Sequence, residues 1–209
     1  MRKNLVGAHP VCAHQYPFHN KFDIIREFSG KRNLHMSFDP AIHDRQSIRL
    51  KQYDYSQTGS YFITICTQER ICFFGDVADR EMHLNSSGLA INKDWRELSN
   101  AFCSISMDSF IIMPNHLHGI ININYEGGKS INHIIKYFKA ISTYHYSLGV
   151  NQSNWSPYPG RLWQRNYYEH IIRTEASLNE IRQYISKNPI EWHLDKNNPR
   201  NFQVGRSPK

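Results

Sequence analysis

Long apolar runs, CxxC motifs and internal repeats are all missing from this chain of 209 residues. No apolar stretch approaches the roughly 18 residues that a membrane-spanning helix needs, so we expect no membrane association. The start is basic and then apolar, but His9, Pro10 and His14 interrupt it too early for a secretory signal peptide. The four cysteines contain no CxxC pair. We expect Cys66 and Cys72 to be buried reduced thiols, which suits a cytoplasmic protein.

The chain does have enough apolar material for a core, and its charge is uneven. The composition is 40% hydrophobic and 13% aromatic, unlike that of a disordered chain. Residues 129–209 hold twelve Lys and Arg against five Asp and Glu, whereas residues 36–128 hold seven against eleven. A basic C-terminal half favours a polyanionic partner, although a solvated basic face gives the same count. Residues 1–35, rich in histidine and without sustained periodicity, are expected to form a loosely ordered extension.

The hydrophobic periodicity of the remaining residues alternates between that of a β-strand and that of an α-helix. Strands are expected at residues 60–67, 110–113, 116–124 and 167–172, and helices at 87–102, 131–146 and 177–187. Ser177 and Glu180 have the spacing of a capping box at the start of the last helix, and Pro189 ends it. This order predicts an α+β fold, a ferredoxin-like antiparallel sheet with helices packed on it.

The pair His116 and His118 is the strongest candidate for a metal site. Residues i and i+2 of a strand point to the same side, so the two imidazoles would face one way while Leu117 faces the core. Two imidazoles suit a divalent ion, and one further oxygen or nitrogen donor would leave positions open for a substrate. Taken alone, His-x-His is a weak signal, because two strand histidines are more often surface or core residues.

Tyr184 and Asn188 form a second pair, four residues apart on the last expected helix. Residues i and i+4 are neighbours on one helical face, here along the edge of an apolar stripe. A tyrosine at such an edge is usually a core residue with a wet hydroxyl, and an Asn before Pro usually ends a helix. Combined with the histidines, the pair predicts a metal held by His116, His118 and Asn188 beside a Tyr184 hydroxyl that attacks phosphorus.

Four segments of the chain carry a family resemblance in the correct order. They are IRLKQYDYS at 48–56, IMPNHLHGI at 112–120, LWQRNYYEHIIR at 162–173 and QYISKNP at 183–189. The second resembles the HUH motif of single-tyrosine transposases. The others resemble the domain start, strand motif and catalytic helix of the REP-associated tyrosine transposases, a branch of that superfamily. The likeness covers about residues 36–195, and it leaves 1–35 as an extension and 196–209 as a C-terminal tail.

The resemblance implies a function that spacing alone does not. Members of this family have the HUH endonuclease fold, use Mg²⁺ or Mn²⁺, and cut single-stranded DNA hairpins at palindromic repeats through a 5′-phosphotyrosine intermediate. By that resemblance His116 and His118 are metal ligands, Tyr184 is the nucleophile and Asn188 is the third ligand. Rival nucleophiles are Tyr137, Tyr144, Tyr146, Tyr167 and Tyr168. The expected protein is a DNA transposase acting as a monomer or homodimer.

Five cations near aromatic residues are candidates for DNA binding, because phosphates attract Lys and Arg and unpaired bases stack on aromatic rings. They are Lys136, Lys139, Arg161, Arg165 and Arg173. Three other functions remain open. A domesticated protein would bind hairpin DNA with little cleavage. A replication initiator or relaxase also uses HUH sites, but relaxases usually place the tyrosine before the histidines. A structural zinc protein would need closely spaced Cys and His pairs.

Overall fold

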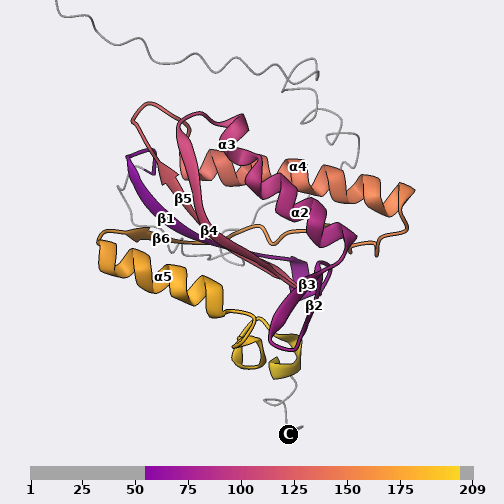
Figure 1. Ribbon diagram of the computed structural model, residues 1–209. Coiled ribbons are helices and arrows are strands. Elements are labelled where there is room, and N and C mark those ends of the chain that lie inside the picture. The colour runs from indigo at the N-terminus through magenta and orange to yellow at the C-terminus, as the bar shows by residue number, and fades with distance from the viewer. Residues whose placement is uncertain (1–54, 203–209) are drawn as a thin grey trace, which may run out of the picture. The chain divides into compact units, whose positions relative to one another are not determined.

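The computed structural model describes residues 55–202, which form an α+β fold (Figure 1). The main elements in chain order are β1 (Gly59–Cys66), β2 (Gly75–Ala78), β3 (Glu81–Leu84), α2 (Ser86–Arg96), α3 (Leu98–Ala101), β4 (Ile105–Met113), β5 (His116–Ile123), α4 (Ile131–Gln152), β6 (Tyr168–Ile172) and α5 (Glu175–Lys187). Short 3-10 turns are η1 (Gln68–Arg70), η2 (Trp192–Leu194) and η3 (Pro199–Phe202). The extension expected at residues 1–35 lies outside the described residues.

Four strands form one antiparallel sheet in the order β4-β5-β1-β6, which confirms the expected ferredoxin-like arrangement. The central pair is β1 and β5, where β-branched residues such as Ile63 and Ile65 favour an extended backbone. A two-residue turn at Pro114 and Asn115 joins β4 to β5. The turn therefore lies beside the start of β5, where His116 is located.

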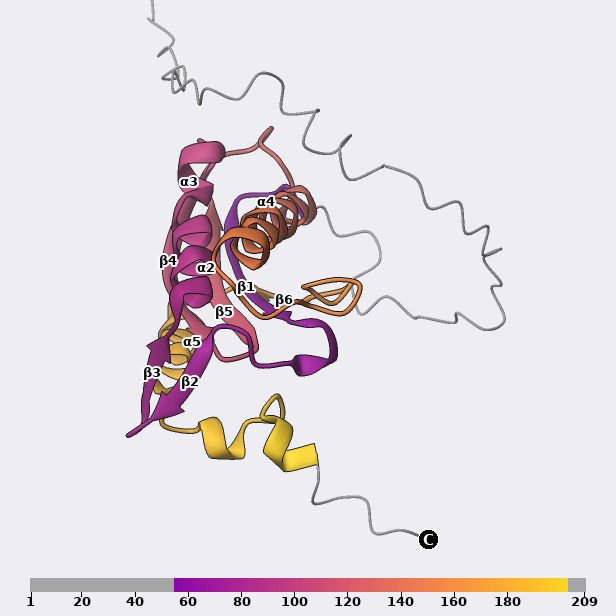
Figure 2. The same cartoon turned by 90° about the vertical axis from the view of Figure 1, so that its right-hand side faces the viewer.

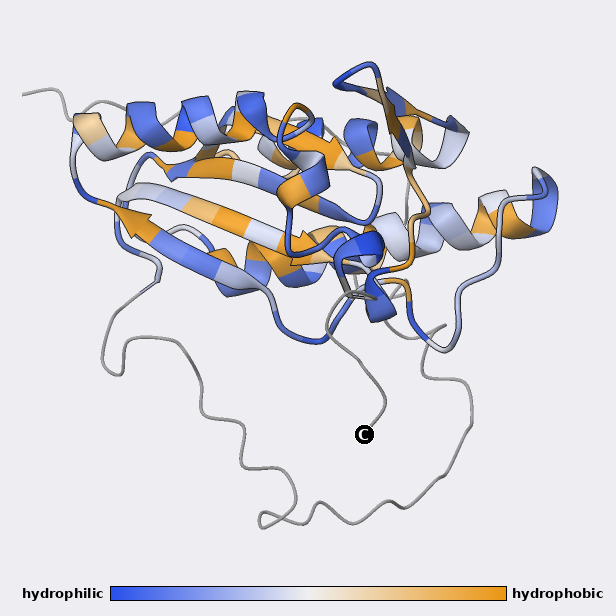
Figure 3. Cartoon of the chain, turned by 90° about the horizontal axis from the view of Figure 1, so that it is seen from below, coloured by the Kyte–Doolittle hydropathy of each residue, from blue (hydrophilic) through white to orange (hydrophobic). Residues whose placement is uncertain are grey.

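Helices cover both faces of this sheet, and each face has its own apolar cluster. The larger cluster joins Ile63, Ile65 and Leu117 to α2 and α4, and the smaller one joins Phe62 and Ile120 to α5. Figure 1 shows α2, α3 and α4 on one side of the sheet and α5 on the other, and Figure 2 shows α2 beside α4. Figure 3 shows apolar and polar residues alternating along the helices, as expected for amphipathic helices on a sheet.

The alternation along β5 decides which face receives the two histidines. His116 and His118 share the parity of Ile120, which packs in the cluster with α5. Gly119 faces the other way, where a Cβ would overlap the ring of Trp95. Trp95 is fully buried, so β5 needs a residue without a side chain at this position.

Several sequence expectations about element boundaries were wrong. Helix α5 begins at Glu175, because the Thr174 hydroxyl accepts from the Ser177 amide at 3.1 Å, so the predicted capping box at Ser177 is not the start. Strand β4 is longer than expected and has an irregularity between Met107 and Phe110. The β2–β3 hairpin was not predicted. Helix α4 continues six residues beyond Tyr146, to Gln152.

The cysteine prediction was partly wrong. Both Cys66 and Cys72 are free thiols, as expected. Burial raises the pKa of each thiol. However, Cys72 is exposed, because it follows η1 in the loop before β2 rather than lying within β1.

The chain beyond α5 folds back against the sheet. Asn197 and Asn198 are buried, and the Asn197 carbonyl accepts from Asn115 Nδ2 at 2.7 Å. Ordered contacts thus continue past residue 195, the predicted end of the domain, and η3 lies in the predicted tail. Within residues 55–202 no helix combines the length and the apolar character needed to cross a bilayer.

Candidate active site

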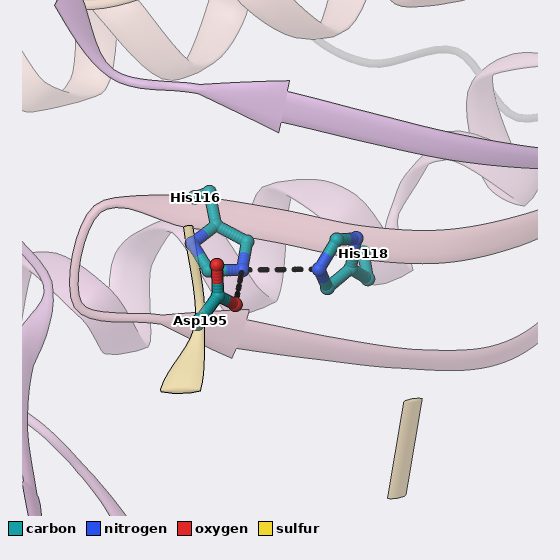
Figure 4. Close-up of side chains that lie close together, drawn as sticks. All are labelled: His116, His118 and Asp195. Atoms are coloured by element: carbon teal, nitrogen blue, oxygen red, sulfur yellow. Dashed lines mark hydrogen bonds and ion pairs between the residues drawn. The ribbon is translucent and has the colours of Figure 1, made fainter. Parts of the chain in front are cut away.

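His116 and His118 lie side by side on β5 with their Nε2 atoms 3.1 Å apart (Figure 4). Both side chains are buried, and the rings meet at 72°. Adjacent ligands of an octahedral divalent ion are about 3.0 Å apart when each bond is about 2.1 Å. The separation of the two nitrogens therefore fits neighbouring positions around one ion.

A hydrogen bond at the opposite ring nitrogen fixes each imidazole. Asn115 Oδ1 lies 2.9 Å from His116 Nδ1, and Thr64 Oγ1 lies 2.8 Å from His118 Nδ1. Asn115 Nδ2 donates to the carbonyls of Arg70 and Asn197, both at 2.7 Å, which sets its Oδ1 toward His116. His116 then donates through Nδ1 and leaves the Nε2 lone pair free, the arrangement that metal-binding histidines use.

Electrostatics keep both imidazoles neutral near pH 7. Burial lowers the pKa of His116 to about 3. Burial, and then the neighbouring His116, hold the pKa of His118 well below its ordinary value. Neutral histidines bind metal ions, because a protonated nitrogen has no lone pair to offer.

Helix α5 places Tyr184 and Asn188 near the two histidines. The Tyr184 hydroxyl lies 3.2 Å from His118 Nε2, and its ring packs edge-on against Phe62. Tyr184 is 42% exposed, so a substrate can reach it. Burial, followed by the charge of Asp195, raises the pKa of Tyr184, which keeps the hydroxyl protonated in the metal-free protein.

Asn188 is 4% exposed and lies close enough to His116 and Tyr184 for its side chain to affect the pKa of each. Its Oδ1 is buried and accepts no hydrogen bond from any described residue. Burying an amide oxygen without a partner costs about 1–3 kcal/mol. A buried amide oxygen without a hydrogen-bond partner, near the imidazole of His116, is what a cation site would contain.

Asp195 adds a carboxylate that the sequence analysis did not identify. Its Oδ2 lies 3.6 Å from His116 Nε2, and ligand atoms of His116, His118 and Asp195 lie within 4.8 Å of one another (Figure 4). No motif marks this residue, since it follows η2 in a segment without periodicity. The supporting residues Thr64 and Asn115 were also missed, and Thr64 could be found only from the strand register.

The site lies where β5 begins and β1 ends. Cys66 pairs with His116 across β1 and β5, and Gln164 N donates to Cys66 O at 2.9 Å. Residues 163–167 thus continue beside the end of β1, along the edge of that strand that faces away from β5. Donors of two neutral imidazoles, an amide oxygen and a carboxylate suit Mg²⁺ or Mn²⁺, which accept oxygen and nitrogen ligands.

The rival tyrosines are placed less favourably, with one exception. Tyr137, Tyr144 and Tyr146 belong to α4, which covers the opposite face of the sheet. The Tyr167 hydroxyl donates to Asn132 Oδ1 at 2.6 Å. Tyr168 alone shares the face of Tyr184, because Thr64 pairs with both His118 and Tyr168. It is 48% exposed and packs against Phe62.

The five predicted DNA-binding cations are spread over the molecule. Lys136 is exposed on α4, away from the Tyr184 face, and Arg173 follows the end of β6 that pairs with Ser60. Arg161 and Arg165 are exposed in or beside the segment that runs along the end of β1.

Lys139 has a different role from the predicted phosphate contact. Its ammonium donates to the carbonyls of Gln164, Arg165 and Asn166 at 2.9, 3.3 and 3.0 Å. An ammonium has three donors, and all three are used here. We assign Lys139 to holding the segment that carries Arg165, and leave it out of the DNA-binding surface.

Comparisons with known proteins identify a family for this chain. The residue pattern of the IS200-like transposases matches residues 54–188. An uncharacterized protein of Haemophilus influenzae is 38% identical over 182 residues, covering 76% of this chain and 96% of that protein. A second Haemophilus influenzae protein, which carries the name of a REP-associated tyrosine transposase, is 26% identical over 66% of this chain and 74% of its own length.

A solved structure gives the same fold. It is that of a REP-associated tyrosine transposase bound to a REP hairpin, with a TM-score of 0.52 at 16% identity. The match covers 71% of this chain and 77% of the other. At this identity the likeness concerns the fold.

Proposed function

The chain belongs to the IS200-like transposase family, and from that premise we propose that it cuts and rejoins single-stranded DNA at hairpin sites through a tyrosine. The observation that carries this proposal is the Tyr184 hydroxyl 3.2 Å from His118 in a site with two neutral imidazoles. Phosphodiester transfer requires a nucleophile that the substrate can reach, here the Tyr184 hydroxyl, and side chains that can bind a metal ion, here the two imidazoles. The REP hairpin in the neighbouring structure supports hairpin DNA as the substrate class.

In the proposed reaction the Tyr184 oxygen forms a bond to phosphorus and the bond to the 3′-oxygen breaks. The products are a 5′-phosphotyrosine and a free 3′-hydroxyl, whose new proton balances the one that Tyr184 loses. Phe62 packs edge-on against the Tyr184 ring, and Asn188 lies one helical turn further along the chain. Reversal of the step with another 3′-hydroxyl would join strands.

His116, His118 and Asn188 would hold the divalent ion. When bound, the ion supplies positive charge that stabilises the developing charge on the phosphate and favours ionised tyrosine. Asn115 and Thr64 keep the two imidazoles turned with Nε2 toward that position. Burial, followed by the charge of Asp195, raises the pKa of Tyr184, so the hydroxyl has to lose its proton during the proposed reaction.

A covalent-adduct assay tests the proposal. The full chain is mixed with a 5′- or 3′-labelled single-stranded hairpin from the flanks of its own gene, with Mn²⁺, and separated on a denaturing gel. The expected result is a labelled band at the mass of the protein plus one DNA fragment, formed only with label on the 3′ side of the cut. Tight hairpin binding without any adduct would instead support a domesticated DNA-binding protein.

Arg165 is proposed as a phosphate contact, because it is exposed and its segment passes Cys66, the β1 residue that pairs with His116. Arg165→Ala should weaken the binding of a short unstructured oligonucleotide and lower the slope of log affinity against log salt by about 0.7. Lys136→Ala is the matched control, an exposed cation on the opposite face, and should leave the slope unchanged. Fluorescence anisotropy at several salt concentrations measures both. Equal slopes for Arg165→Ala and the unaltered protein would remove Arg165 from the site.

A further inference from the structure

Asp195 reaches the histidines from a part of the chain outside the region that matches the family. The matched residues end at 188, whereas Asp195 follows η2. Its Oδ2 lies 3.6 Å from His116 Nε2, and its side chain is 8% exposed. The carboxylate also affects the pKa of His118, Cys66 and Tyr184. It is thus directed into the candidate metal site.

The other candidate ligands lack a negative charge, which the Asp195 carboxylate would supply. His116, His118 and Asn188 are all neutral, so together they offer a divalent cation no negative charge. Mg²⁺ and Mn²⁺ are hard ions that prefer anionic oxygen ligands. Among the described residues, Asp195 is the one carboxylate whose oxygen lies within 4.8 Å of both imidazole donors.

Local structure holds the Asp195 carboxylate in place. Asn197 N donates to Asp195 Oδ1 at 2.6 Å, which leaves Oδ2 turned toward His116. The Asp195 carbonyl accepts from Asn198 N at 3.0 Å and from Asn201 Nδ2 at 2.8 Å. Asn197 is tied in turn to Asn115, the partner of His116. The turn and the histidine pair therefore form one hydrogen-bonded unit.

We propose that Asp195 is the anionic ligand of the divalent ion held by His116 and His118. The proposal rests on the proposed function only for the presence of a metal. Its consequence is that metal affinity depends on a residue that follows the catalytic helix. Removing the carboxylate has opposite expected effects on two equilibria. Metal binding weakens, whereas metal-free DNA binding holds or tightens, because a negative charge near the phosphate is lost.

The test measures Mn²⁺ binding to the full chain without DNA, by the loss of the free-ion signal in electron paramagnetic resonance. Asp195→Asn keeps the shape of the side chain and should weaken Mn²⁺ binding about 10- to 100-fold. Glu191→Gln is the control, an exposed carboxylate close enough to affect the pKa of Tyr184, and should bind Mn²⁺ like the unaltered protein. Thermal unfolding without metal should be alike for all three, and Mn²⁺ should raise the midpoint less for Asp195→Asn.

Each outcome separates the two proposals. If the unaltered chain binds no Mn²⁺, the metal part of the proposed function fails. If it binds Mn²⁺ and Asp195→Asn binds within about twofold of it, Asp195 is not a ligand, whatever the adduct assay gives. Equal weakening by Glu191→Gln would overturn the proposal too, because general attraction by acidic residues would then explain the effect.

Discussion

Tyr184→Phe should lower covalent adduct formation by at least about 10³-fold while hairpin binding stays within a few-fold of the unaltered protein. The substitution removes one oxygen from a ring that Phe62 and His118 already hold. The packing of α5 is therefore expected to survive, and the loss would come from chemistry. The labelled-hairpin gel measures the adduct, and anisotropy measures binding.

Tyr168→Phe is the matched control for this change. Tyr168 is the other exposed tyrosine on this face, it contacts the same Phe62, and it stands in the same row of the sheet as His118. It should form adduct at close to the normal rate. If Tyr168→Phe formed no adduct while Tyr184→Phe formed it normally, Tyr168 and not Tyr184 would be the nucleophile.

His116→Ala should reduce Mn²⁺-dependent cleavage by about 100-fold or more, because it removes a buried nitrogen from the proposed metal site. The same gel gives the rate across a range of Mn²⁺ concentrations. His170→Ala is the control, since His170 is exposed on β6 and pairs with Phe62 on the same face. Because His116 is buried, thermal unfolding of His116→Ala is measured together with cleavage. His116→Gln serves as a second variant if His116→Ala does not fold.

Mixing the Tyr184→Phe and His116→Ala proteins tests whether one chain supplies the whole site. In this structure the Tyr184 hydroxyl and His118 belong to one chain, and Arg182 of α5 forms an ion pair with Asp108 of β4 at 2.7 Å. The mixture should therefore stay as inactive as either protein alone. Recovery to a large fraction of normal activity would mean that α5 is exchanged between two copies.

The sequence predicted elements and pairs whose signals are local. His116 and His118 alternate with buried Leu117, and Tyr184 and Asn188 are one helical turn apart, so periodicity alone placed each pair on one side. The start of α5 was misplaced because Thr174 and Ser177 are both good capping residues and only the hydrogen bond distinguishes them. The β2–β3 hairpin was missed because each strand is four residues long and mostly polar.

Long-range relations were beyond sequence reasoning. Thr64 reaches His118 only through the register of β1 on β5, and Asp195 reaches His116 only because the chain folds back after α5. Lys139 donates to the carbonyls of residues 164–166, and the spacing of residues in the sequence does not show that this segment lies beside α4. These contacts follow from tertiary packing, which decides among several local arrangements of similar free energy.

The separation of Tyr184 from His118 by 66 positions along the chain has a consequence for biosynthesis. The ribosome makes the histidines first, then the residues of α4 and β6, and only afterwards the tyrosine and Asp195. On the proposed assignment, a nascent or prematurely ended chain holds the sheet and the imidazoles but has no group able to cut. We therefore expect DNA cleavage to begin only after α5 has been synthesised and has docked.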